Sequence, residues 1–356
     1  MIYNIQLLRA FAALSVVYLH VVSDAGLNLD IGVGNFGVDL FFVISGFTMA
    51  YVGHMPAGTF FVRRCIRIIP LYWLATLGTF LIAWFAPTLI QSASASVPHL
   101  LHSLVFLPFP NKFGLLQPTL ALGWTLNYEM YFYLLFTAAL VFTLRHAPLL
   151  ACVFIVAICM VIRFAGLEDR SVLFYADPIV YEFAMGILVY YSVASMSLRI
   201  VAISGGIRAV LAIVALAAAI ALPLQENIIS GERALWAGIP AAILVFSSVL
   251  LEKRGRMAAR HSWVVLLGDS SYVLYLVHPY IVYGIIRLFL TPAKMSVPAL
   301  ALAIVGLPLI AMVAAIGIHL GVERPVTALL RNRLSPKQAS AVALPEPTIN
   351  VISAKE

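Results

Sequence analysis

The chain contains 356 residues, of which 63% are hydrophobic and only 10% are charged. Soluble domains carry charge on about a quarter of their residues, so this composition excludes a soluble globular protein and predicts an all-α, polytopic membrane protein. The formal net charge is +7, but the basic residues form no continuous patch or stripe, which argues against a nucleic-acid partner.

Apolar runs of the length that crosses a bilayer recur along the whole chain. Because a transmembrane helix needs about 20 such residues, we expect about ten transmembrane helices, at roughly 5–22, 36–53, 68–86, 122–143, 148–165, 177–195, 207–223, 234–251, 265–289 and 298–320. The first run lacks a Lys/Arg-rich start and a small-residue cleavage site. We therefore expect it to be retained rather than removed as a signal peptide.

The basic residues indicate how the chain is oriented in the membrane. Most of them fall in alternate connections or after the last span, namely Arg63, Arg64, Arg67, Arg145, Arg199, Arg208, Lys253, Arg254, Arg256, Arg260, Arg324, Arg331, Arg333 and Lys337. Cytoplasmic connections are enriched in Lys and Arg. Both termini are therefore predicted to be cytoplasmic, and an even number of spans agrees with this.

Two segments outside the predicted spans stand out. Residues 87–121 form a long and mostly apolar connection with four prolines after position 97, which favours a segment lying at the membrane interface. Residues 335–356 are rich in Ser, Ala and Pro and are predicted to be a disordered cytoplasmic tail. The three cysteines, Cys65, Cys152 and Cys159, form neither a disulfide framework nor a metal signature, so no metal site is expected.

The first span carries two polar residues on one face. Arg9 and His20 are eleven residues apart, which is three helical turns plus about 20° and a rise of about 16 Å. A cation and an imidazole aligned on one face of a transmembrane helix are costly to expose to lipid. The pair therefore predicts a functional site inside the helix bundle.

Two carboxylates are expected near the depth of His20. Asp39 opens the second span, and Glu129 lies a couple of turns inside the fourth. A histidine oriented by a carboxylate can act as a general base towards a hydroxyl group. The structural alternative is that His20 and Asp39 only bridge two neighbouring helices, and depth alone does not separate the two interpretations.

The segment before the third span brings together Arg63, Arg64 and Arg67. At spacings of three and four residues these guanidiniums can converge on one helix face, and guanidinium binds phosphate in a bidentate manner. This predicts a site for a nucleotide-bearing donor. The alternative is that the three arginines only mark a cytoplasmic connection.

Polar and aromatic residues of the fourth and ninth spans complete the candidate site. We assign substrate contacts to Trp124, Asn127, Tyr131, Tyr275 and His278. Tyr275 and His278 share one face of the ninth span with Ser271, and Pro279 is expected to kink that helix. A packed, helix-bridging histidine is the competing interpretation of His278.

Taken together, these motifs resemble the acyltransferase-3 family of membrane O-acyltransferases, and within it the bacterial exopolysaccharide O-acetyltransferases. The resemblance runs from QLLRA at 6–10 to ERP at 323–325 and covers nearly the whole membrane region. It rests on Arg9 followed by His20, GVDLFFVISGF at 37–47, RRCIRIIP at 63–70, WTLNYE at 124–129 and SYVLYLVHP at 271–279.

The resemblance implies an acyltransferase domain over residues 1–334 in a bacterial inner membrane. It also implies acetyl-coenzyme A or another acyl-coenzyme A as co-substrate, with no tightly bound cofactor, and a polysaccharide or lipid-linked saccharide as acceptor. The family's essential histidine and its partner arginine fall on His20 and Arg9. Its arginine pair falls on Arg64 and Arg67, and its acidic residues fall on Asp39 and Glu129.

We therefore expect coenzyme A to bind from the cytoplasm, with its phosphates at Arg63, Arg64 and Arg67 and its arm running past Arg9 to His20. His20 would deprotonate the acceptor hydroxyl, or alternatively would carry the acetyl group as a covalent intermediate. The rival prediction is a saccharide or proton-coupled transporter, because intramembrane ionisable groups also serve transport. Coenzyme A binding separates the two classes.

Overall fold

A computed structural model describes residues 2–24, 35–90, 95–195, 205–221, 233–252, 262–289 and 297–334. Within these ranges the chain is helical and contains no β-strand, only an isolated bridge between Pro110 and Leu116. The all-α prediction is therefore confirmed. The predicted disordered tail, residues 335–356, lies outside the described residues.

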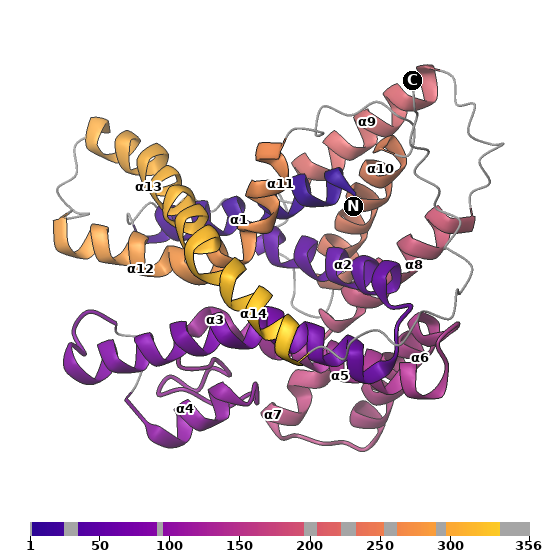
Figure 1. Ribbon diagram of the computed structural model, residues 1–356, viewed down its shortest axis with the longest axis horizontal. Coiled ribbons are helices and arrows are strands. Elements are labelled where there is room, and N and C mark those ends of the chain that lie inside the picture. Colours follow the sequence, from indigo (N-terminus) through magenta and orange to yellow (C-terminus); the bar gives the residue numbers. More distant parts are fainter. Residues whose placement is uncertain are drawn as a thin grey trace.

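The helices follow the order of the predicted spans (Figure 1). They are α1 (Tyr3–Asp24), α2 (Asn35–Val52), α3 (Ala57–Phe85), α4 (Val97–Leu104), η1 (Ala121–Gly123), α5 (Trp124–Phe142), α6 (Ala147–Phe164), α7 (Arg170–Leu173), η2 (Phe174–Ala176), α8 (Val180–Ser195), α9 (Gly205–Ala221), η5 (Ala234–Gly238), α10 (Ile239–Glu252), α11 (Ser262–Asp269), α12 (Ser271–Phe289), α13 (Val297–Ile318), η7 (His319–Glu323) and α14 (Arg324–Leu334).

Within the described residues, six helical segments are long and apolar enough to cross a membrane: Tyr3–Asp24, Ala57–Phe85, Ala147–Phe164, Arg170–Ser195, Ala234–Glu252 and Leu302–Leu334. The broken pair α11 and α12 adds a seventh if it counts as one span. A helix is present at each predicted span, and α2 is one of the shorter apolar helices. The count of about ten spans and the cytoplasmic placement of both termini stay predictions.

The ninth predicted span is broken at a position that the sequence did not indicate, and the kink expected at Pro279 stays a prediction. Pro279 lies inside α12, whereas the 60° bend lies between α11 and α12, at Ser270. The hydroxyl of Ser270 donates to the carbonyl oxygens of Leu266 and Leu267 in α11. A hydroxyl that bonds back to the preceding turn bends helices, so Ser270 accompanies the break and Pro279 does not cause it.

The central helix of the described bundle is α1, which packs against α2, α10, α11, α12 and α13. In Figure 1 it lies between the α12–α13 pair and the side formed by α2 and α10. Ala12, Ala13 and Val17 are completely buried, and small residues let neighbouring helices approach closely in a membrane. This position lets α1 line two interior cavities.

Helices α2 and α8 pack closely against each other at two glycines. A Cβ atom at Gly46 would collide with the backbone carbonyl of Phe183, and one at Gly186 would collide with that of Val43. Each glycine therefore faces the backbone of the opposite helix, which is how glycine is used at tight membrane-helix contacts. The contact fixes α2, whose other faces line the site described below.

The arginine motif lies within α3 rather than in a connection before it. The helix begins at Ala57, after Pro56, so Arg63, Arg64 and Arg67 occupy its second and third turns. Arginine is a good helix former, and Pro70 is accommodated inside the same 29-residue helix. The three side chains are therefore fixed at helical spacing.

The connection after α3 folds back onto that helix through α4. The Tyr72 hydroxyl donates to the carbonyl oxygen of Ser103 at 3.0 Å, and Trp73 Nε1 donates to that of Leu104 at 2.9 Å. The Ser103 hydroxyl accepts from the Thr119 amide at 2.8 Å. These bonds hold residues 97–119 against the bundle, and placement of this segment at the membrane interface stays a prediction.

We predict that Gly46→Ala destabilises the fold, because the added methyl group meets a backbone carbonyl that cannot move independently. Overpacking of this kind costs about 1–3 kcal/mol, and thermal unfolding of the purified protein in detergent measures it. The matched control is Gly78→Ala in α3, where a Cβ atom meets nothing within 4 Å. Equal unfolding temperatures for the two variants would contradict the tight α2–α8 contact.

Candidate active site

One helix lines two separate cavities inside the bundle. The N-terminal half of α1 contributes Gln6 and Arg9 to the first, and its C-terminal half contributes Leu19 and His20 to the second. We call them the arginine cavity and the histidine cavity. The expectation that Arg9 and His20 face the bundle interior from one helix is therefore met, with about 16 Å of helix between them.

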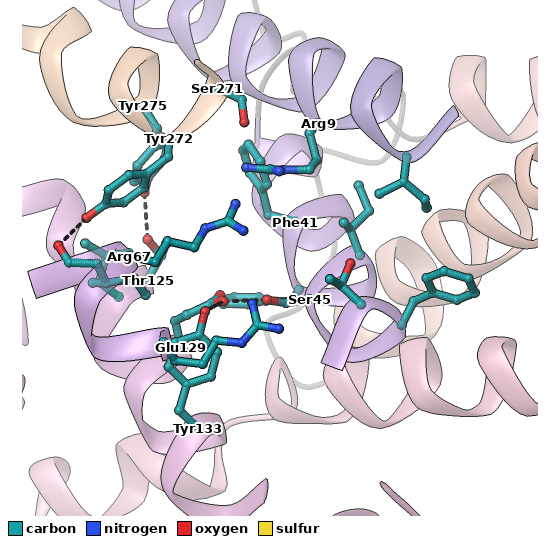
Figure 2. Close-up of a pocket in the computed structure, with 18 of the residues that line it drawn as sticks. Arg9, Phe41, Ser45, Arg67, Thr125, Glu129, Tyr133, Ser271, Tyr272 and Tyr275 are labelled. Carbon is teal, nitrogen blue, oxygen red and sulfur yellow. Dashed lines mark hydrogen bonds between the residues drawn. The ribbon is translucent and has the colours of Figure 1, made fainter. Parts of the chain in front are cut away.

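The arginine cavity has a volume of about 420 Å³ and lies between α1, α2, α3, α5 and α12. Its charged lining residues are Arg9, Arg64, Arg67 and Glu129. Figure 2 shows Arg9 and Arg67 reaching into the same open space, with Glu129 and Ser45 facing it from below. Three guanidiniums against one carboxylate leave the lining positively charged, which suits an anionic ligand.

Neutral donors hold Glu129 in place. The Ser45 hydroxyl donates to Glu129 Oε1 at 2.5 Å, and the Tyr133 hydroxyl donates to the same oxygen at 2.6 Å. Hydroxyl donors orient a carboxylate without neutralising its charge. Glu129 is therefore the anion that balances part of the positive charge around it.

Two of the arginines are positioned by contacts at the cavity wall. The guanidinium of Arg64 lies over the rings of Phe60 and Tyr133, at 5.3 and 5.7 Å from their centroids. Such cation–π contacts are attractive and leave the N–H edge available. Arg9 Nη1 donates to Gln6 Oε1 at 3.2 Å, and Gln6 Nε2 donates to Asp269 at 3.0 Å.

The histidine cavity has a volume of about 710 Å³, and its lining includes His20, Asp24, Trp124, Tyr280, Tyr283 and Arg287. The Tyr283 hydroxyl lies 3.3 Å from His20 Nδ1. The ring of His278 packs against the ring of His20, with centroids 5.1 Å apart. His20 is therefore held on two sides while it still lines the cavity.

Tyr275 and Val38 form the wall between the two cavities, because both residues line each of them. The hydroxyls of Tyr275 and Thr125 lie 2.9 Å apart, and both donate to the carbonyl oxygen of Leu122. The Tyr275 ring packs edge-on against Phe41 at 6.0 Å. A single layer of side chains, formed by Tyr275 and Val38, therefore separates the arginines from His20.

Comparisons with known proteins identify the family. The acyltransferase-3 model, described as an acyltransferase domain, matches residues 2–318. The chain belongs to the acyltransferase-3 family. It is 32% identical over 326 residues to the exopolysaccharide production protein ExoZ of Rhizobium meliloti (strain 1021), an alignment that covers 88% of this chain and 98% of that protein. No solved structure matches. The resemblance drawn from the motifs is therefore confirmed.

In this acyltransferase-3 protein, the two carboxylates that the sequence predicted near His20 lie in different surroundings. Neither Asp39 nor Glu129 forms a hydrogen bond with His20. Glu129 lines the arginine cavity. Asp39 is ion-paired with Arg233, which donates from Nε at 2.7 Å and from Nη2 at 3.1 Å. The prediction that Asp39 contacts His20 is therefore wrong, because Asp39 contacts Arg233 instead. On α2, Val38 faces the cavities, and the next residue points about 100° away, towards Arg233.

Arg63 is the member of the arginine motif that lines neither cavity, whereas Arg64 and Arg67 both line the arginine cavity. On a helix, residue 67 lies about 60° from residue 64 and about 40° from residue 63, on the same side of residue 64, so Arg63 lies at the edge of this face that is farthest from Arg64. The convergence of three guanidiniums from this motif is thus reduced to two. Arg9 of α1 supplies the third.

The five residues assigned to substrate contact divide into two groups. Trp124 and Tyr275 line the histidine cavity. Asn127, Tyr131 and His278 line neither cavity, and Asn127 and His278 are almost completely buried. Asn127 and Tyr131 each lie about 200° around α5 from Glu129, so they face away from the arginine cavity. The competing interpretation of His278, a packed histidine, fits its position behind His20.

Sequence reasoning missed Tyr283, Asp24 and Arg287 as groups around His20. A signal for two of them was present, because Tyr275, Pro279, Tyr283 and Arg287 follow one another at intervals of four residues and share one helix face. Asp24 ends α1 one turn beyond His20. The described residues contain no group of three or more His, Cys, Asp or Glu side chains placed to hold a metal ion.

We predict that Asp39→Asn destabilises the protein by about 2 kcal/mol, because a hydrogen-bonded guanidinium loses its anion. Thermal unfolding in detergent measures this loss. Arg233→Gln should cause a similar loss, and the double variant should lose less than the sum of the two. Strictly additive losses would show that the ion pair contributes no coupling energy.

Proposed function

We propose that this protein is a membrane O-acyltransferase of the bacterial inner membrane. It moves an acetyl or other short acyl group from acyl-coenzyme A to a hydroxyl of an exopolysaccharide or its lipid-linked saccharide precursor. The observation that carries the proposal is the arrangement along α1, where an arginine-lined cavity and a histidine-lined cavity share one wall. This arrangement fits an anionic donor on one side and an activated acceptor on the other.

The donor side fits coenzyme A by charge. Arg9, Arg64 and Arg67 outnumber Glu129 in the lining of the arginine cavity, and guanidinium groups bind phosphate through paired hydrogen bonds. The charge bias that predicts a cytoplasmic start of α3 also supports a cytoplasmic opening for this cavity. In this proposal Arg64 and Arg67 bind the diphosphate, and the acyl-pantetheine arm extends along α1.

The transfer step assigns His20 as general base. With Nδ1–H donating to the oxygen of Tyr283, Nε2 carries the lone pair that removes the proton from the acceptor hydroxyl. The acceptor oxygen then forms a bond to the thioester carbonyl carbon, and the carbon–sulfur bond breaks. The departing thiolate takes the proton from the imidazolium, so the histidine is restored.

The acceptor side fits a saccharide. The histidine cavity is lined by Trp124, Tyr280 and Tyr283 together with the polar groups Gln117 and Thr119. Aromatic faces combined with a few hydrogen-bonding groups are typical of small-molecule sites. A relative named as an exopolysaccharide production protein supports an exopolysaccharide as the class of acceptor.

We predict that His20→Asn lowers the rate of acyl transfer about 10²–10⁴-fold, because the general base is lost, while binding of coenzyme A is unchanged. Transfer is measured with radiolabelled acetyl-coenzyme A and purified polysaccharide. His146→Asn is the control, since His146 is exposed and lines neither cavity. Undiminished turnover in the His20 variant would remove the proposed role of this histidine.

We predict that Arg64→Ala raises the dissociation constant for coenzyme A about tenfold through the loss of one charge-assisted contact. Arg63→Ala, one residue earlier and outside the cavity lining, should leave the constant unchanged. Isothermal titration calorimetry in nanodiscs measures both variants. Equal effects of the two substitutions would indicate that the arginine motif only marks a cytoplasmic connection. If the wild-type protein binds no coenzyme A, the transporter becomes the better interpretation.

A further inference from the structure

A third hollow adjoins the arginine cavity. It is a cleft of about 720 Å³ where α3, α11, η7 and α14 meet, and we call it the α14 cleft. Arg67 lines both this cleft and the arginine cavity. Figure 1 shows α14 crossing α3, against which it packs. The two hollows therefore meet at Arg67.

The cleft presents arginines that have no protein partner among the described residues. Its lining contains Arg67, Arg324 and Arg331, and none of the three forms a hydrogen bond or ion pair with a described residue. The two carboxylates of the lining are already engaged. Glu323 accepts from His319 at 2.6 Å, and Asp269 accepts from Gln6 at 3.0 Å.

The spacing on α14 concentrates this charge on one face. Arg324 and Arg331 are seven residues apart, which is two turns less about 20° and a rise of about 10 Å. Thr327 lies between them and also lines the cleft, whereas Arg333 does not. Positive-inside charge requires arginines on this side of the membrane, but it does not require them to face Arg67 from one stripe.

Resting on the proposed function, we infer that the α14 cleft binds the 3′-phosphate of the donor nucleotide through Arg324 and Arg331. The diphosphate then lies near Arg67, where the cleft meets the arginine cavity, and the uncharged acyl-pantetheine arm enters that cavity. Guanidinium is suited to a terminal phosphate monoester, whose oxygens accept several charge-assisted bonds. Anionic lipid headgroups carry the same chemistry and are the alternative source of phosphate.

The test compares coenzyme A with 3′-dephospho-coenzyme A by calorimetry, using the full-length protein in phosphatidylcholine nanodiscs. Arg331→Ala should bind coenzyme A about tenfold more weakly than the wild type. The wild type should bind the dephospho ligand about tenfold more weakly than coenzyme A. Arg331→Ala should bind the dephospho ligand as tightly as the wild type binds it, because the substitution and the missing phosphate each remove one partner of the same contact.

Arg333→Ala is the matched control, since it removes the same charge from the same helix outside the cleft, and its affinity for coenzyme A should equal that of the wild type. If Arg331→Ala binds both ligands like the wild type, the inference is overturned. It is equally overturned if phosphatidylglycerol nanodiscs stabilise the wild type but not Arg331→Ala while coenzyme A affinity is unchanged, which would assign the cleft to lipid. A wild-type protein that binds neither ligand instead removes the proposed function itself.

Discussion

The structure depends on how positive charge is held inside an apolar helix bundle. Arg9, Arg64 and Arg67 come from two helices that are far apart in the sequence, and Glu129 from a third helix is the carboxylate in the same lining. A charge in such a setting is tolerated only when it faces the bundle interior and finds a partner. Because guanidinium groups outnumber carboxylates in this lining, a bound anion would balance the remaining positive charge. The need to neutralise buried charge therefore also creates a binding site for an anion.

Tyr275 lies at the boundary between the arginine cavity and the histidine cavity. The ring lies between the arginines and His20, anchored by Leu122 and Thr125, and it forms part of the wall that the two cavities share. Transfer as proposed requires the acyl group to pass this layer, and a closed layer would keep water in one cavity away from a thioester in the other. The same residue that the sequence suggested as a substrate contact therefore forms the boundary between the two halves of the site.

The residues that carry the family resemblance divide into two classes in the structure. Arg9, His20, Arg64, Arg67 and Glu129 line cavities. Asp39 is instead ion-paired with Arg233, and Gly46 of the same motif lies against the backbone of α8. The motif on α2 thus supplies both a tight helix contact and an ion pair on the faces that point away from the cavities. Val38 and Ser45 of the same motif face the cavities. The residues of the motif at 37–47 therefore fix the position of α2 in the bundle as well as lining the cavities.

The sequence by itself determined the all-helical membrane architecture, because apolar runs in a bilayer must satisfy their backbone groups internally. It also determined that Arg9 and His20 share a face, because helical geometry is local. It did not determine that Asp39 meets Arg233, that Arg63 lies outside the lining of the arginine cavity, or that Tyr283 rather than a carboxylate contacts His20. Those outcomes depend on which faces of distant helices meet, and only the tertiary packing around α1 sets the rotation of each helix.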